Sequence, residues 1–312
     1  MSISYVICTC QANFTSHNGF RWPALGEVVF PDFEATDDRC GSGLYGFLNG
    51  CGSRYGYVIS WESDDQWLLV AVPSDTIIDL GSYVKFPAGE VVFSSQDRLA
   101  VIAELERRNP ETKLMPIIGA ARVSMLECAS ILTGYRGSST SGDKGQSTSG
   151  DQGISISGAR GTSITGDSGK SMSGYGGTST SGCGGSSTSG EYGSSNSGGH
   201  GKSTSSHYGK AISGDHGTSI SGYGGQSISG RGGTSISEDR GYSTSGDYGT
   251  SIVGFRGEAQ SGLNGNLIFF CIENGGITKP KSFFVDGVNV KANTFYRCEE
   301  GKLIEVNKAV EK

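Results

Sequence analysis

The sequence lacks several features that mark common classes of protein. It has only 7 prolines and 4 histidines among 312 residues, and no run of eighteen or more apolar residues. So little proline argues against a Pro-rich linker, and the absence of a long apolar run predicts no membrane-spanning segment. Basic residues are also in deficit, since 25 Lys and Arg stand against 31 Asp and Glu, for a net charge of −6. Binding to nucleic acid is therefore not expected, because it usually requires a basic stripe.

Neither a signal peptide nor a disulfide framework is evident. The first ten residues have no basic segment and no small-residue cleavage site, so they indicate the start of a strand and a cytoplasmic location. In that compartment the eight scattered cysteines are expected to be mostly free thiols. Cys8 and Cys10 would lie on one face of a strand, but with Cys40 and Cys51 they do not show the spacing of a zinc knuckle. We expect no metal and no cofactor.

Composition divides the chain into three segments. Residues 1–117 hold all three tryptophans and predict an N-terminal α+β domain, with strands near 4–10, 27–30, 57–61, 67–72, 76–80 and 90–94. One helix is expected over 97–108, where Ser95 or Asp97 can cap it and Leu99, Ile102 and Leu105 give an apolar face. Residues 118–261 form a repeat segment, of which 118–133 is an apolar capping coil. Residues 262–312 predict a small C-terminal β cap.

The repeat is an octapeptide, Gly-x-x-Gly-x-Ser-x-Ser, and it runs in phase from Gly134 to Ser261. Gly and Ser usually indicate a flexible linker, but a linker has no reason to keep four positions in register over sixteen octads. Ordered stacking does require it. Eight extended residues trace only about 26 Å, so one octad is too short to close a coil around side chains. We therefore predict a mainly β protein with a central β-solenoid of about eight 16-residue coils.

The orientation of the Ser-x-Ser strand has two interpretations. The central column is the only one that leans apolar, as in Ile156 and Ile220, so it is placed inside, with both serine columns facing solvent. The alternative buries the serines in a very tight core, and Ala211, Val253 and Ala259 at serine positions favour it. The first interpretation is preferred because each buried hydroxyl needs a hydrogen-bond partner.

At the level of the coil, the repeat resembles bacterial ice-nucleation proteins. Their 16-residue coil is also two octads, with Thr-x-Thr and Ser-Leu-Thr strands between glycine-containing turns, and here Ser-Thr-Ser and Ser-Ile-Ser stand at the same spacing. The resemblance covers about residues 126–261 and implies the solenoid architecture. It also suggests that the protein organises ice or water, although ice-organising faces are rich in Thr, whose methyl and hydroxyl groups together order water, and serine is expected on the outer faces here.

The flanking segments resemble an uncharacterised domain of bacterial and phage proteins, through stretches such as 22–26, 40–46 and 84–92. That resemblance implies a bacterial or phage source. Residues 40–45, Cys-Gly-Ser-Gly-Leu-Tyr, also resemble a motif of ADP-ribosyltransferases, which implies that Gly43 and Tyr45 would line a nicotinamide pocket. No upstream His-Gly motif and no clear catalytic Glu accompany them. The alternative is a glycine-rich turn with Tyr45 in the core.

The turns carry scattered tyrosines and aspartates. Calcium-binding β-rolls place a ligating Asp in every turn, whereas this column varies, so calcium is not expected. Exposed tyrosine favours protein contact, including a side-by-side homodimer. The candidate binding residues are Tyr175, Tyr192, Tyr208, Tyr223 and Tyr248. The preferred hypothesis is a non-enzymatic scaffold that binds a protein partner or itself through flat Ser-lined faces. Ice organisation and an N-terminal enzyme are the alternatives.

Overall fold

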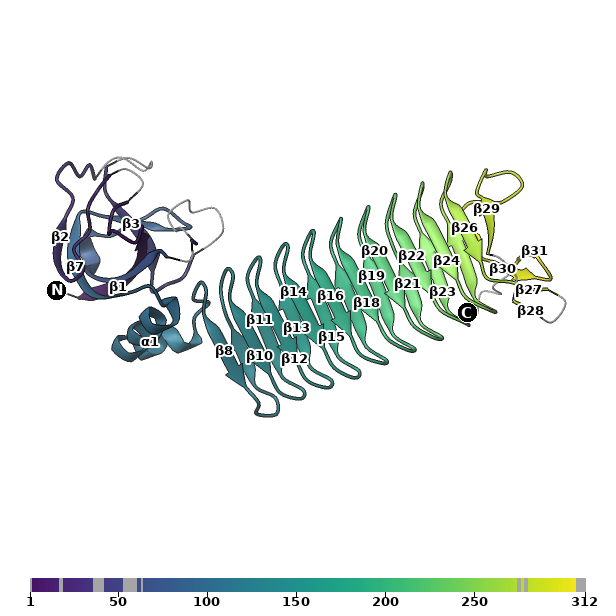
Figure 1. Ribbon diagram of the computed structural model, residues 1–312, viewed down its shortest axis with the longest axis horizontal. Coiled ribbons are helices and arrows are strands. Elements are labelled where there is room, and N and C mark those ends of the chain that lie inside the picture. Colours follow the sequence, from purple (N-terminus) through teal and green to yellow (C-terminus); the bar gives the residue numbers. More distant parts are fainter. Residues whose placement is uncertain are drawn as a thin grey trace. The chain divides into compact units, whose positions relative to one another are not determined.

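A computed structural model describes residues 2–16, 19–35, 42–52, 61–62, 64–273, 276–277 and 280–306. The protein is mainly β, with 46% of residues in strands and 7% helical, as the sequence predicted (Figure 1). The chain forms two compact units, Met1–Arg122 with Leu132–Ser138, and Val123–Ile131 with Ser139–Lys312. Among the described residues no helix is long and apolar enough to cross a membrane. Residues 57–60 of the strand expected at 57–61, and Cys40, lie outside the described residues.

A seven-stranded antiparallel sheet forms the first unit. Its strands, in spatial order, are β2 (Gly26–Val29), β7 (Ala88–Ser95), β4 (Gln66–Pro73), β1 (Ile3–Cys10), β3 (Leu44–Leu48), β6 (Val84–Phe86) and β5 (Ile78–Asp79). Apolar residues alternate along the strands, so Val6 and Leu68 enter one core while Ile7 and Leu69 enter the other. Part of the expected strand at 76–80 is instead the short 3₁₀ helix η1 (Ser74–Thr76).

The expected helix is α1 (Arg98–Arg108), and it covers the second of these cores. Asp97 caps it as predicted, because its side chain accepts a 2.9 Å hydrogen bond from the Leu99 backbone N–H. Ile102 and Leu105 are buried as predicted, whereas Leu99 is exposed and Val101 takes its place on the apolar face. A second 3₁₀ helix, η2 (Pro110–Leu114), follows.

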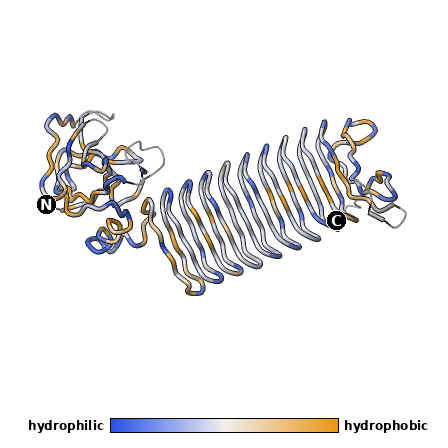
Figure 2. Tube along the Cα trace, in the orientation of Figure 1, coloured by the Kyte–Doolittle hydropathy of each residue, from blue (hydrophilic) through white to orange (hydrophobic). Residues whose placement is uncertain are grey.

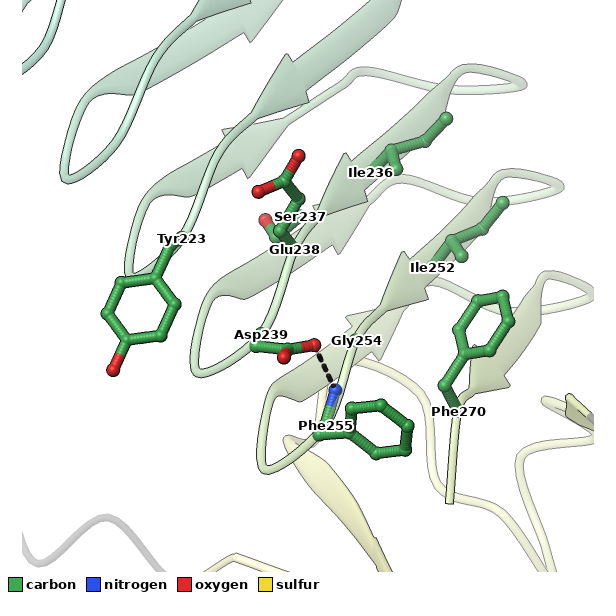
Figure 3. Close-up of a pocket in the computed structure, with 9 residues that line it drawn as sticks. All are labelled: Tyr223, Ile236, Ser237, Glu238, Asp239, Ile252, Gly254, Phe255 and Phe270. Carbon is green, nitrogen blue, oxygen red and sulfur yellow. Dashed lines mark hydrogen bonds between the residues drawn. The ribbon is translucent and has the colours of Figure 1, made fainter. Parts of the chain in front are cut away.

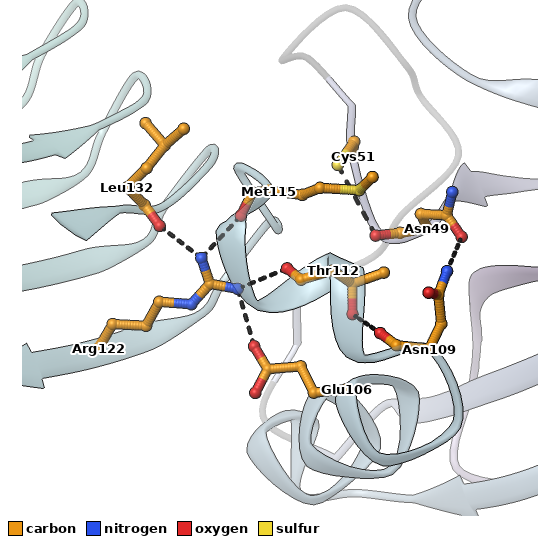
Figure 4. A network of polar contacts seen from close by, with 8 residues as sticks. All are labelled: Asn49, Cys51, Glu106, Asn109, Thr112, Met115, Arg122 and Leu132. Atoms are coloured by element: carbon orange, nitrogen blue, oxygen red, sulfur yellow. Dashed lines mark hydrogen bonds and ion pairs between the residues drawn. The ribbon is translucent and has the colours of Figure 1, made fainter. Parts of the chain in front are cut away.

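Arg122, on β8 (Ala121–Ser124), links η2 and α1 to the last segment of the first unit (Figure 4). Its guanidinium donates at 2.7 Å to the carbonyl oxygens of Met115 and Leu132, and at 3.0 Å to that of Thr112. It also pairs with Glu106 at 2.8 Å. The five N–H donors of a guanidinium group have a rigid, planar arrangement, so one arginine can donate to several acceptors that point toward it. This contact could not be predicted, because its acceptors are mostly main-chain atoms.

The repeats form a solenoid of about nine turns, because the expected capping coil supplies the first turn before the eight coils of the repeat; β26, from the expected C-terminal cap, adds one more strand at the other end. Each strand pairs in parallel with the strand sixteen residues later, as with Thr218↔Thr234, so two octads make one coil as predicted. The first sheet contains β8, β10 (Ser138–Ser141), β12 (Ile154–Ser157), β14 (Lys170–Ser173), β16 (Ser186–Ser189), β18 (Lys202–Ser205), β20 (Thr218–Ser221), β22 (Thr234–Ser237), β24 (Thr250–Val253) and β26 (Asn266–Phe269). The second contains β9 (Ser130–Leu132), β11 (Gln146–Ser149), β13 (Thr162–Thr165), β15 (Thr178–Ser181), β17 (Ser194–Ser197), β19 (Lys210–Ser213), β21 (Gln226–Ile228), β23 (Tyr242–Ser245) and β25 (Glu258–Ser261).

The preferred strand orientation was wrong: the serines lie inside the solenoid and the central residues of Ser-x-Ser face outward. Ser147, Ser163 and Ser179 are fully buried, while Ile164 is 42% exposed. Most of the buried hydroxyls find partners within the core; those of Thr165 and Ser205 do not. The Ser179 hydroxyl, for example, donates at 2.6 Å to the carbonyl oxygen of Thr188, nine residues on, and lies 2.9 Å from the Ser173 hydroxyl. The objection to buried serine therefore fails, because the facing strand supplies an acceptor.

The repeat glycines are needed for close packing more than for left-handed backbone. The left-handed residue is the third of each octad, often not glycine, as in Tyr192 with φ 56°. At the first position, a Cβ on Gly198 would lie 2.8 Å from the backbone nitrogen of Cys183 in the preceding coil. At the fourth, a Cβ on Gly201 would lie 2.7 Å from the Cβ of Ser197. Both contacts are closer than packed atoms allow.

The C-terminal cap belongs to the second unit and gives the solenoid an apolar end. Strand β29 (Lys281–Phe284) pairs with β26, and β30 (Tyr296–Glu299) pairs with β25 and with β31 (Lys302–Glu305). A short β27 (Ile272–Glu273) and β28 (Gly276–Ile277) pair separately. Their core includes Val253, Leu267 and Phe269. Cys271 and Cys298 form a disulfide, while Cys8, Cys10, Cys51, Cys128 and Cys183 are free thiols.

Candidate functional site

Two series of turns border the solenoid, and they differ in side chains. We call the turns at 142–145, 158–161, 174–177, 190–193, 206–209, 222–225, 238–241 and 254–257 the tyrosine edge. The turns between them in sequence form the opposite edge. Four of the five predicted tyrosines meet on the tyrosine edge, because the second and third octad positions of successive coils lie one above another. The fifth, Tyr248, is on the opposite edge.

The four tyrosines form a continuous ladder. The ring centroids of Tyr175 and Tyr192 are 5.5 Å apart, those of Tyr192 and Tyr208 are 5.3 Å apart and stacked, and those of Tyr208 and Tyr223 are 5.6 Å apart. Tyr192 is 56% exposed and Tyr208 is 52% exposed, so the ladder presents its aromatic surface to solvent. A contiguous row of exposed aromatic rings is typical of a contact surface.

On the opposite edge, Tyr248 stands beside a cation instead of in a row of rings. The guanidinium of Arg231 lies 5.3 Å from its ring centroid. Two imidazoles, His200 and His216, stack further along this edge with centroids 5.2 Å apart. Across the described part of the chain, no three His, Cys, Asp or Glu side chains gather into a group that could hold a metal ion.

The turn aspartates hold consecutive coils together. The Asp167 carboxylate accepts a 2.8 Å hydrogen bond from the backbone N–H of Cys183 in the next coil, and Asp215 does the same for Arg231. Asp143, Asp151, Asp239 and Asp247 repeat this contact sixteen residues apart. Each of these carboxylates therefore has a structural role in coil stacking.

The flat faces are lined by the fifth and seventh octad positions, and the predicted Ser-lined faces are wrong because the serines point inward. On the first sheet, Thr218, Thr234 and Thr250 stand in register. Beside them runs a second row of Ile220, Ile236 and Ile252. Figure 2 shows apolar residues recurring at strand centres and polar residues at many turns. Over these three strands the outer face is thus a lattice of methyl and hydroxyl groups, whereas Lys170 and Lys202 occupy the same outward position on earlier strands of the sheet.

The predicted nicotinamide pocket residues are placed in the N-terminal sheet. Gly43 is buried, and a Cβ there would lie 2.8 Å from the side chain of Lys85 and 3.3 Å from the ring of Phe33. Tyr45, on β3, packs its ring 6.0 Å from that of Tyr83. The space beside Gly43 is therefore filled by the chain itself.

The thiols of β1 are held protonated. Burial raises the pKa of Cys8 well above its usual value and raises that of Cys10 to about 12, with a smaller contribution from the nearby Asp65 carboxylate. Because the thiolate is the nucleophile and the metal ligand, neither side chain is activated for chemistry at neutral pH.

Comparison with known proteins supports the likeness of the repeat. An ice nucleation protein of Pseudomonas fluorescens is 38% identical over 89 residues, which is 28% of this chain and 7% of that protein. The chain thus matches only a small part of its curated relative. No family model matches the chain, and no solved structure does. The 16-residue coil and this match together show that the central segment is an ice-nucleation-protein-like β-solenoid.

Proposed function

We propose that this protein is a β-solenoid scaffold that associates with a second copy of itself through the tyrosine edge. The observation that carries the proposal is the ladder of Tyr175, Tyr192, Tyr208 and Tyr223, of which the first three are exposed and the fourth is half-buried. Aromatic side chains bury large areas at low entropic cost, so a row of four offers a natural centre for an interface. Cationic residues flank the row at both ends, where they form a polar rim.

Charge favours a parallel arrangement of the two copies. A two-fold axis along the solenoid places the second octad position of each turn opposite the third position of the same turn in the other copy. Asp143 then faces Lys144. In the same way Asp239 faces Arg240. Opposite charges across an interface fix its register.

An antiparallel arrangement is disfavoured. An axis perpendicular to the solenoid, centred on the tyrosine row, places third positions opposite each other. Arg160 would then face Arg240, and Lys144 would face Arg256. Like charges in contact across an interface cost several kcal/mol.

Sedimentation velocity over a range of concentrations tests the association. The wild-type protein is expected to dimerise, and the double variant Tyr192→Glu, Tyr208→Glu to stay monomeric, because it places carboxylates in the centre of the aromatic row. Tyr248→Glu is the matched control, since Tyr248 is equally exposed, at 58%, but lies on the opposite edge. A wild-type monomer at the highest attainable concentration, or a double variant that still dimerises, contradicts the proposal.

The exposed Cys128, at the start of the tyrosine edge, tests the register. In a Cys183→Ser background, pyrene attached to Cys128 should give excimer emission, because the parallel arrangement brings the two labels together. The double variant Cys128→Ser, Cys183→Ser, labelled in the same way, measures the background from other thiols. Dimerisation without excimer emission would contradict the parallel register.

A second candidate, organisation of ice or water, is favoured by the outer face of the first sheet. Its rows of Thr218, Thr234 and Thr250 with the adjacent isoleucines present methyl and hydroxyl groups at the spacing of a β-sheet. Droplet freezing and thermal hysteresis of the purified protein test it. Thr234→Lys should weaken the effect and Thr178→Lys, on the other sheet, should weaken it less. Behaviour identical to buffer removes this candidate.

A further inference from the structure

A pocket of about 440 Å³ lies near the C-terminal end of the tyrosine edge (Figure 3). The pocket forms where large side chains replace the residue at the first octad position, which is glycine in most turns of this edge. Glu238 and Phe270 replace that glycine two coils apart, and Gly254 stands between them. The two side chains therefore flank a gap one coil wide. Gly254 cannot carry a side chain, since a Cβ there would lie 2.3 Å from the Asp239 carboxylate.

The walls of this pocket are apolar on both sides. Ile236 and Ile252 line it from β22 and β24, while Tyr223 and Phe255 line it from the turns. Phe270, which is 40% exposed, closes the end nearer the cap. A cavity of this size with apolar walls and few polar groups is typical of a small-molecule site.

Two carboxylates, those of Glu238 and Asp239, give the pocket its negative charge. The Asp239 side chain is already engaged, since it accepts a 2.8 Å hydrogen bond from the Phe255 backbone N–H. Glu238 is exposed, and its carboxylate has no hydrogen bond or ion pair with any residue in the described ranges. The guanidinium of Arg240 lies 5.8 Å from the centroid of the Tyr223 ring, so that ring already has a cationic partner, and the rings left for a ligand are those of Phe255 and Phe270. Aromatic rings beside a carboxylate are the chemistry that recognises an ammonium group.

We propose that this pocket binds an organic ammonium group attached to an apolar body. The ammonium group pairs with the Glu238 carboxylate, and the apolar part lies over Gly254 between Phe255 and Phe270. A free amphipathic amine and the lysine side chain of a peptide share this chemistry. The site overlaps the surface proposed for dimerisation at Tyr223 and Asp239, so its binding is also measured in the double variant that is expected to stay monomeric.

Isothermal titration calorimetry with phenethylammonium chloride tests the site, with 2-phenylethanol as the neutral probe of the same shape. We expect saturable binding of the amine that is at least tenfold tighter than that of the alcohol. Glu238→Gln should weaken amine binding at least tenfold and leave the alcohol unchanged. Glu191→Gln, on the same edge but outside the pocket, is the matched control and should bind as wild type does.

Three results would overturn the proposal: no saturable binding of the amine, equal binding of the alcohol, or unchanged amine binding by Glu238→Gln. Phe270→Ala should also weaken both probes, and circular dichroism establishes that each variant is folded. A short peptide with one central lysine, compared with its norleucine counterpart, distinguishes a peptide from a free amine as the source. Repeating the titration in the Tyr192→Glu, Tyr208→Glu double variant separates failure of this site from failure of the dimer.

Discussion

The two units of this protein bury different kinds of side chain. The N-terminal sheet packs two apolar cores, with residues such as Leu68 and Leu69 fully buried. The middle coils of the solenoid bury serine hydroxyls instead, as at Ser163 and Ser179. The first unit therefore depends on the area of apolar surface removed from water. The solenoid depends on main-chain hydrogen-bond ladders and on serine hydroxyls, nearly all of which are hydrogen-bonded. It therefore tolerates little change in the shape of a coil, but the removal of any one side chain should cost little stability.

The largest expected effect of a substitution is in the apolar core. Leu69→Ala, on β4, should lower the free energy of unfolding of the first unit by about 2–5 kcal/mol, because it removes buried methyl groups and leaves a cavity. Since all three tryptophans are in this unit, urea unfolding followed by tryptophan fluorescence measures it. Leu99→Ala, on the exposed side of α1, is the control. A loss below about 1 kcal/mol would show that this core is loosely packed.

Adjacent glycines test the shape dependence of the solenoid. Gly198→Ala should cost about 1–3 kcal/mol, because its Cβ would lie 2.8 Å from the backbone of the preceding coil. Gly199→Ala should cost little, since the nearest atom to its Cβ is 3.5 Å away. Thermal unfolding monitored by far-ultraviolet circular dichroism compares the two. Equal melting temperatures would show that the coils separate more easily than the geometry indicates.

The difference between the units also explains what the sequence could reveal. Strict phase identified the solenoid and its 16-residue coil, and the cap at Asp97 identified α1. Hydropathy led to the wrong choice of which strand residues are buried, because it ranks Ile as more hydrophobic than Ser. The space between the two sheets is narrow enough to suit serine, and carbonyl oxygens of the facing strand accept hydrogen bonds from the serine hydroxyls. One signal pointed correctly: the small apolar residues Ala211, Val253 and Ala259 at serine positions. The pocket was not predicted, because it depends on two residues, Glu238 and Phe270, that replace the first glycine of the octad in coils on either side of Gly254.

A single serine of the solenoid core should matter less than a leucine of the sheet. The Ser203 hydroxyl lies 2.9 Å from the Ser197 hydroxyl and also contacts the carbonyl oxygen of Ile212. Ser203→Ala should cost about 1 kcal/mol, since it removes these bonds but leaves no sizeable cavity. Ala211, in the same column, shows that alanine fits. The control is Thr204→Ala, which faces outward and should be neutral. A cost like that of Leu69→Ala would refute the comparison.

The smallest effect is expected at the turn aspartates, which act at the surface. Asp167→Ala removes the acceptor for the Cys183 backbone N–H, but water can replace it at an exposed turn, so the cost should be about 0.5 kcal/mol. The array itself indicates this tolerance, since Ala159 occupies the same octad position. Glu191→Ala is the control, because its carboxylate forms no such bond in the described part of the chain. Combining Asp151→Ala with Asp215→Ala, which lie four coils apart, should give the sum of the single effects if coils interact mainly with their neighbours. A loss much greater than that sum, measured by thermal unfolding, would show that coil stacking is cooperative over longer distances than the serine core suggests.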